Sequence, residues 1–241
     1  ADKYRLSNIV AILDANRLGL SGESLHGHDI GRWVRKFDAF GWNTFVVDGH
    51  DIYAILDAFK SIRRIEGPSV IIARTLKGKG VSFLEDKEGW HGKPLKQDEL
   101  QRALAELGPL PKIDAKKLIR TAKKKSLAGK LSKGKLSTNY SLGELISTRE
   151  AYGRALEKIG ARQDVVALDG DVKNSTFAEI FKKRYPERFF DCYIAEQNMV
   201  GMAIGFAARG FVPFSSTIAA FLSPDHDQIR MAAISHSNIK L

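Results

Sequence analysis

The sequence has a single cysteine, Cys192, among 241 residues, which excludes an intramolecular disulfide and a zinc site built from several cysteines. It has no run of 18 or more apolar residues, and residues 1–5 lack the apolar core of a signal peptide. We therefore expect a cytoplasmic protein without a membrane partner. Apolar residues make up 44% of the chain, which is enough to bury one large core or two ordinary ones.

Acidic residues are fewer than basic ones, 28 against 38, which gives a net charge of +10. The excess of basic residues is confined to one segment. Residues 112–135 hold nine Lys and one Arg against one Asp, a net of +9, which leaves +1 for the rest of the chain. No aromatic residue interleaves these charges. We interpret residues 112–143 as a solvated basic linker and expect no nucleic-acid partner. A tethered contact with nucleic acid or another acidic surface is the alternative.

Apolar strands alternate with amphipathic helices on both sides of this segment, a pattern typical of a parallel sheet covered on both faces. The sequence therefore predicts an α/β fold with two units, residues 1–111 and 144–241. In the first unit we expect strands at 8–13, 43–47 and 68–73 and helices at 30–40, 51–64 and 97–107. In the second we expect strands at 164–168, up to Ala195 and at 212–215, and helices at 148–159, 176–185, 196–208 and 226–235.

The segment with the strongest chemical signature covers residues 188–200. Its apolar strand delivers the carboxylate of Glu196 to the start of an apolar helix. Such a carboxylate is either solvated and favoured by the helix dipole, or held inside a site where it exchanges protons. The apolar residues on both sides of Glu196 favour the second interpretation.

Two loops of the first unit follow predicted strands, which is where α/β sheets bind ligands. Asn16 supplies an amide oxygen and Leu18 a backbone carbonyl, and Mg²⁺ accepts both together with phosphate oxygens, although an ordinary turn has the same composition. In the second loop, glycines allow close approach of the backbone and Lys77 attracts phosphate, unless it is merely solvated. His91 follows, and an imidazole can relay protons at neutral pH.

A phosphate-binding pair is predicted beyond the basic segment. Arg149 can hold a phosphate with a forked pair of hydrogen bonds, and Ser175 can donate another from a loop at a strand end. A solvated Arg at a helix start and a turn Ser are the alternatives. Asp169 and Asp171 lie nearby, but the Gly and Glu of an EF-hand loop are missing at their offsets, which argues against Ca²⁺.

Several of these segments, in the same order, resemble motifs of the transketolase family. Residues 191–199, Asp-Cys-Tyr-Ile-Ala-Glu-Gln-Asn-Met, resemble the motif whose Glu hydrogen-bonds the aminopyrimidine N1′ of thiamine diphosphate. Residues 9–20 resemble the end of the family's diphosphate motif, and residues 71–94 resemble loops that line its cofactor. The resemblance implies two thiamine-diphosphate-binding folds, each incomplete in this chain, that bind thiamine diphosphate with Mg²⁺, for which Ca²⁺ or Mn²⁺ can substitute.

The resemblance also implies a role for each candidate residue. Glu196 and His91 would be catalytic; Asn16, Lys77, His91 and Phe221 would contact the cofactor; Asn16 and Leu18 would hold the metal; His91, Arg149 and Ser175 would bind the sugar phosphate. The chain departs from the family at two places near Phe221: Ile218 stands where a second Phe is frequent, and Ser-Pro-Asp-His at 223–226 replaces the more usual Thr-Arg-Ala-Phe.

The implied activity is the transfer of a two-carbon ketol unit from a ketose phosphate to an aldose phosphate in the pentose phosphate pathway, by a homodimer with active sites between subunits. The family's diphosphate motif opens with Gly-Asp-Gly, which is not found before Asn16, so we expect an internal portion of a longer transketolase that is not fully competent alone. The alternatives are another thiamine-dependent enzyme, such as deoxyxylulose-phosphate synthase or a ketoacid dehydrogenase, and a non-catalytic transketolase-like interaction protein.

Overall fold

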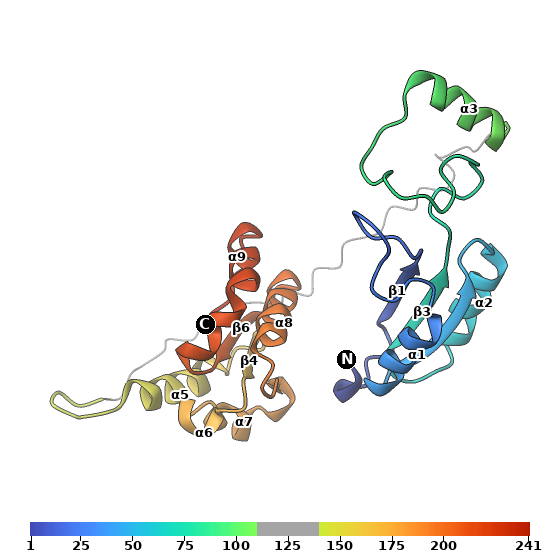
Figure 1. Ribbon diagram of the computed structural model, residues 1–241. Coiled ribbons are helices and arrows are strands. Elements are labelled where there is room, and N and C mark those ends of the chain that lie inside the picture. The colour runs from blue at the N-terminus through green and yellow to red at the C-terminus, as the bar shows by residue number, and fades with distance from the viewer. Residues whose placement is uncertain (110–139) are drawn as a thin grey trace. The chain divides into compact units, whose positions relative to one another are not determined.

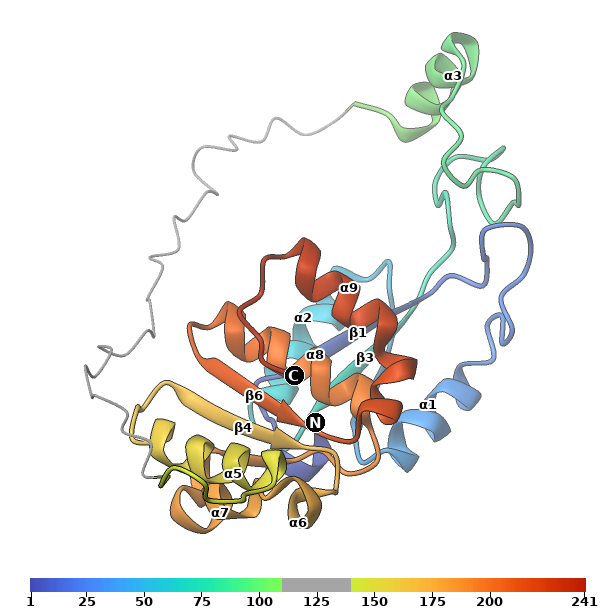
Figure 2. The ribbon, with the colours of Figure 1, turned by 90° about the vertical axis from the view of Figure 1, so that its left-hand side faces the viewer.

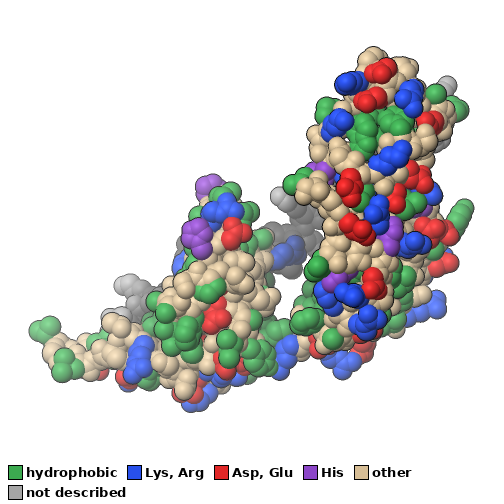
Figure 3. Space-filling view, viewed as in Figure 1, with side chains coloured by type: hydrophobic (Ala, Val, Ile, Leu, Met, Phe, Trp, Pro, Cys, Tyr) green, Lys and Arg blue, Asp and Glu red, His purple; other side chains and the backbone are tan. Residues whose placement is uncertain are grey.

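The computed structural model describes residues 1–109 and 140–241, which form two compact units (Figure 1). The basic segment 112–135 and the predicted unit boundary at residue 111 lie outside the described residues. Figure 3 shows acidic and basic side chains interspersed on the face in view of both units, with no large patch of one sign. None of the helices within the two described ranges has the length and apolar character needed to span a bilayer.

The first unit is a parallel sheet with strand order β1-β3-β2 and a helix on each face (Figures 1 and 2). The predicted pattern of strands and helices is confirmed here, with ends that differ by up to two residues. The elements are η1 (Asp2–Tyr4), β1 (Val10–Ala15), α1 (Ile30–Ala39), β2 (Asn43–Asp48), α2 (Ile52–Ile62), β3 (Ser69–Arg74) and α3 (Gln97–Leu107).

The central strand β3 explains how this unit packs. Val70 and Ile72 point to the face covered by α1, while Ile71 points to the face covered by α2, and all three are buried. Because both faces of β3 are covered, its sequence is continuously apolar rather than alternating. Each covering helix begins at an aspartate whose side chain accepts backbone N–H groups: Asp29 caps α1 and Asp51 caps α2.

The second unit has the same plan, a parallel sheet with strand order β5-β4-β6. Phe181 packs with Leu156 of α5 on one face of the sheet, and Met199 of α8 packs on the other. The elements are α5 (Thr148–Ile159), β4 (Val165–Asp169), α6 (Lys173–Thr176), α7 (Glu179–Arg184), η2 (Pro186–Arg188), β5 (Phe189–Asp191), α8 (Glu196–Ala208), β6 (Val212–Ser216), η3 (Ala219–Asp225) and α9 (His226–Ile234).

Two local predictions for this unit were wrong. The helix expected at 176–185 begins only at Glu179 of α7, because Phe177, which separates α7 from the short α6, adopts a left-handed backbone with φ of 59°. The strand expected to reach Ala195 ends at Asp191, and Tyr193 is also left-handed with φ of 55°.

Candidate active site

In the first unit, the predicted metal and phosphate residues lie beyond the carboxyl ends of neighbouring strands. Asn16 follows β1 and Lys77 lies three residues after β3, whose last residue Arg74 is in register with Ala15 of β1. The carboxyl ends of parallel strands meet at one edge of the sheet, so both loops emerge at that edge. The structure therefore brings the Asn16 and Lys77 loops to one edge of the sheet.

Side-chain bonds join these two loops. The guanidinium of Arg17 donates from Nε to Asp86 Oδ1 at 3.0 Å and from Nη2 to the Asp86 carbonyl at 3.1 Å. Asp86 in turn donates its N–H to the Lys77 carbonyl at 2.8 Å. The hydroxyl of Thr75 donates to Asp14 of β1. These contacts fix the β1 turn against the β3 loop.

The β1 turn presents two neutral oxygens that fit part of a magnesium site. Asn16 Oδ1 accepts the Leu18 N–H at 3.0 Å, which folds the turn around the amide and leaves the oxygen a second lone pair. The carbonyl of Leu18 lies on the same turn. Mg²⁺ takes such oxygens when ligand phosphates and water complete the octahedron. The described residues contain no cluster of three or more His, Cys, Asp or Glu able to hold a metal, so any metal here would depend on these neutral donors.

His91 follows the Lys77 loop along the chain. It occupies an exposed turn in the segment between β3 and α3, which extends beyond the sheet (Figure 1). Its neighbour Trp90 packs edge-on against Phe83, with ring centroids 6.1 Å apart, and Lys93 lies 4.2 Å from the Trp90 ring. These contacts pack beside the turn that carries His91.

In the second unit, Glu196 is the first residue of α8 and lies at the carboxyl edge of the sheet. A side chain at Gly170 would place its Cβ 3.5 Å from Glu196 Oε1 and 3.1 Å from Thr217 Oγ1, so these three residues converge at the ends of β4 and β6. Glu196 is partly buried, and Thr217 Oγ1 is buried without a hydrogen-bond partner in the described part of the chain. The prediction that Glu196 begins a helix is confirmed.

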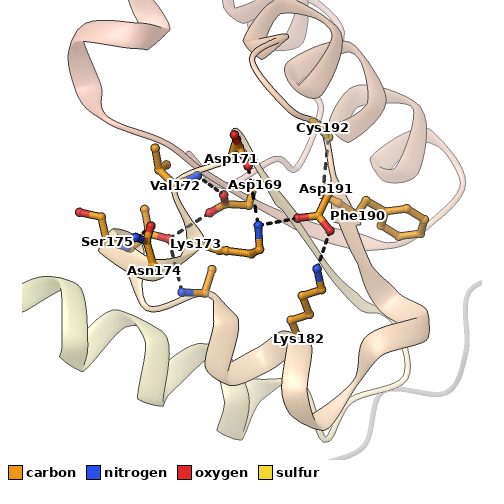
Figure 4. A network of polar contacts seen from close by, with 12 residues as sticks. Asp169, Asp171, Val172, Lys173, Asn174, Ser175, Lys182, Phe190, Asp191 and Cys192 are labelled. Atoms are coloured by element: carbon orange, nitrogen blue, oxygen red, sulfur yellow. Dashed lines mark hydrogen bonds and ion pairs between the residues drawn. The ribbon is translucent and has the colours of Figure 1, made fainter. Parts of the chain in front are cut away.

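A buried polar network holds the loop between β4 and α6 (Figure 4). Asp169, fully buried at the end of β4, accepts the Val172 N–H at 2.7 Å and the Thr176 hydroxyl at 3.0 Å. Burial raises the pKa of the Asp169 carboxyl despite these two donors. Asp191 of β5 pairs with Lys173 at 3.1 Å and Lys182 at 2.6 Å.

The two lysines determine the charge state of Asp191. Partial burial opposes its charge, but Lys182 and Lys173 overcome this effect and hold the pKa of Asp191 below its ordinary value. Because Lys173 lies on α6 and Asp191 on β5, the ion pair links the loop that carries Ser175 to the strand that leads toward Glu196. The network therefore fixes two parts of the candidate site relative to each other.

The predicted phosphate pair is also brought together. Arg149 Nη1 donates to Ser175 Oγ at 3.3 Å, and Arg149 is exposed at the start of α5. The guanidinium borders a pocket of about 290 Å³ lined by Arg149, Tyr152, Thr176, Ser215, Ser216, Thr217 and others. The Tyr152 hydroxyl hydrogen-bonds Ser216 Oγ at 2.5 Å, and burial raises the pKa of Tyr152 to about 12, so it stays neutral. The pocket therefore offers one cation and several hydroxyls to a ligand.

The remaining apolar candidates lie on the surface of the same unit. Phe221 and Ile218 are each 45% exposed, at or next to η3. Pro224 lies within η3, its carbonyl accepts a hydrogen bond from Gln197 Nε2 at 2.8 Å, and α9 begins two residues later. Cys192 is buried, and burial raises the pKa of its thiol to about 11.

Sequence reasoning missed Asp169, Thr217 and Asp225 as parts of this region. A polar residue that ends a fully apolar strand was the available signal for Asp169. Thr217 and Asp225 gave no local signal, because their burial depends on contacts with distant segments.

Comparison with known proteins assigns each unit to a family. Residues 1–141 match the family described as the transketolase thiamine diphosphate binding domain, and residues 144–241 match the transketolase pyrimidine binding domain. The sequence is 46% identical over 247 residues to the transketolase of Homo sapiens, covering 100% of this chain and 39% of that protein. It is 42% identical over 248 residues to transketolase-like protein 1 of Macaca fascicularis, covering 100% of this chain and 41% of that protein.

Solved structures agree on the fold. Campylobacter jejuni transketolase aligns with a TM-score of 0.76 at 21% identity, and Pichia stipitis transketolase in complex with sedoheptulose-7-phosphate with a TM-score of 0.78 at 18% identity. Each alignment covers 99% of this chain and 43% of the solved chain. The chain thus spans about two fifths of the curated relatives named here. The two matched domains cover nearly all of it, and the chain belongs to the transketolase family.

Proposed function

We propose that the protein carrying this chain is a transketolase, which binds thiamine diphosphate with Mg²⁺ and transfers a two-carbon ketol unit from a ketose phosphate to an aldose phosphate. The observation that carries the proposal is Glu196: a carboxylate at the start of α8, partly buried against Gly170 and Thr217. The two matched thiamine-diphosphate-binding domains support the same cofactor.

The residues of this chain divide the work between the two units. Asn16 and the Leu18 carbonyl would share the metal with the cofactor's phosphates, with Lys77 offsetting negative charge nearby. Glu196 would hold a proton at its carboxylate and exchange it with the aminopyrimidine ring, against which Phe221 would pack. The bound cofactor supplies the electron sink for cleavage of the sugar's carbon–carbon bond. His91 would hold or move a proton on the sugar.

Arg149 and Ser175 suit the phosphate of the sugar. A phosphate between the Arg149 guanidinium and the Ser175 hydroxyl would replace their 3.3 Å hydrogen bond with charge-assisted bonds to its oxygens. The Lys173–Asp191 pair keeps Ser175 on a fixed loop, which lowers the ordering cost of binding.

Exposed apolar residues around Glu196 support a homodimer with its sites at the interface. Ile194 is 84% exposed, Tyr193 is 49% exposed, and Phe221 and Ile218 are each 45% exposed. Apolar side chains of this size gathered around a carboxylate suit a surface that a second subunit covers. We also assign the protein to the cytoplasm and to the pentose phosphate pathway, because the chain belongs to the transketolase family.

The deciding experiment is a transfer assay with xylulose 5-phosphate and ribose 5-phosphate, using the complete gene product with thiamine diphosphate and Mg²⁺. Glu196→Gln should lower kcat by about 100-fold or more, the usual scale for loss of a proton-exchanging group. Glu187→Gln, the same change at an exposed residue of η2, is the matched control and should be neutral. Equal activity of E196Q and E187Q would refute the role of Glu196.

A non-catalytic transketolase-like role is the second candidate. It is favoured by Ile218 and by Pro224, which stand in the segment around the expected pyrimidine contact. Titration calorimetry with thiamine diphosphate and Mg²⁺ separates the two functions: the enzyme binds the cofactor, whereas absence of binding by the correctly folded gene product would favour the interaction protein.

A further inference from the structure

Asp225 is a buried acid that the proposed function does not use. It lies at the end of η3 and is 0% exposed, and neither carboxylate oxygen has a hydrogen-bond partner among the described residues. It also occupies the N-cap position of α9, where an aspartate usually accepts backbone N–H groups, yet its side chain makes no such bond. A carboxylate buried without donors is among the least stable arrangements in a protein.

The position of Asp225 places it beside Glu196. The helices packed against η3 are α8, which begins with Glu196, and α9. Gln197, the residue after Glu196, donates from Nε2 to the carbonyl of Pro224, the residue before Asp225, at 2.8 Å. A direct hydrogen bond between α8 and η3 therefore joins the residue after Glu196 to the residue before Asp225.

The other charged groups on these helices do not neutralise Asp225. On α9 they are His226, Asp227 and Arg230, which are all exposed, and Arg230 pairs with Asp227 at 2.6 Å. Arg209 stands at the opposite end of α8 from Glu196. Burial and then the charge of Glu196 raise the pKa of Asp225. Among the described residues, the charge that acts on Asp225 is therefore that of another acid, Glu196.

We propose that Asp225 keeps its proton at neutral pH and acts as a positioning residue for Glu196, the two acids forming a coupled pair that carries one negative charge. A neutral Asp225 adds no second negative charge at the start of α8. Ionisation of Asp225 would place two negative charges at the start of α8, and each would oppose the other. The number of protons held by the pair, rather than by Glu196 alone, would then determine when Glu196 can exchange one with a ligand.

The catalytic meaning of this coupling rests on the proposed function of Glu196, but the coupling is measurable without cofactor or sugar. Infrared spectroscopy of the whole chain detects the carbonyl stretch of a neutral carboxylic acid. At neutral pH we expect a band that is lost in Asp225→Asn and kept in Asp227→Asn, the same change at an exposed residue two positions away. The difference between wild type and D225N also separates Asp225 from Asp169, the other buried acid with a raised pKa.

The coupling itself is tested by Glu196→Gln, which removes the neighbouring charge and leaves Asp225 intact. The Asp225 band should then disappear at a lower pH than in wild type, because loss of the like charge makes ionisation of Asp225 easier. A merely structural Asp225 would show no such shift. An ionised Asp225 at neutral pH, or an unchanged titration in E196Q, would overturn the proposal. If D225N fails to fold, ¹³C-labelled aspartate in wild type and E196Q gives the same two readings.

Discussion

The contact between Gly153 and Phe177 predicts that adding a single methyl group at Gly153 lowers the stability of the fold. Gly153 lies buried in the middle of α5, and a Cβ at this position would stand 2.4 Å from the Phe177 carbonyl oxygen and 2.5 Å from the Phe177 Cβ. Backbone atoms cannot turn aside as a flexible side chain can. Gly153→Ala must therefore displace either α5 or the left-handed turn at Phe177 that separates α6 from α7.

Two opposing terms determine the expected magnitude. Alanine in place of a helical glycine gains about 1 kcal/mol of helix propensity. Forcing an extra methyl into a packed core costs about 1–3 kcal/mol, and the upper end applies because the contact involves backbone. We therefore expect G153A to lower the free energy of unfolding by about 1–2 kcal/mol.

Gly201→Ala in α8 is the matched control, since a Cβ there meets nothing within 4 Å. It should raise the free energy of unfolding by about 0.5–1 kcal/mol. Both variants are compared with wild type by urea denaturation followed by circular dichroism. If G153A is as stable as G201A, the close contact between α5 and Phe177 does not exist as described.

Three further predictions use the same denaturation assay. The side chain of Arg188 is 12% exposed and donates to three backbone carbonyls at 2.6, 2.8 and 3.1 Å. Arg188→Met should therefore lower the free energy of unfolding by about 3 kcal/mol, and a loss near zero would contradict these hydrogen bonds. Leu156→Ala, at a 2% exposed core position, should cost about 2–5 kcal/mol, and a smaller loss would mean that the core collapses into the cavity. Asp164 accepts a forked pair of hydrogen bonds from Arg162, which holds the pKa of the Asp164 carboxyl below its ordinary value. The stability that this carboxylate contributes is present above its pKa in the unfolded chain and is lost as the pH falls through its pKa in the folded chain. The stability of Asp164→Asn should therefore fall less than that of wild type below about pH 4.

The sequence was sufficient to predict the alternation of strands and helices. Residues 70–72 of β3 are continuously apolar because both faces of that strand are covered, and this pattern is readable without coordinates. Asn16 and Lys77 were each expected in a loop that follows a strand, and β1 and β3 end just before these loops. Glu196 was expected at a helix start, and α8 begins there.

Tertiary structure alone decided which polar groups are buried and how they pair. The break at Phe177 follows from the bond between Thr176 and the buried Asp169, seven residues earlier, and from the close approach of Gly153. Nothing local in the sequence distinguishes Asp225, which is fully buried, from Asp227, which is exposed. The periodicity of helices and strands is a local property of the sequence, so it could be predicted. The burial and pairing of polar side chains are set by segments far apart in the chain, so they could not.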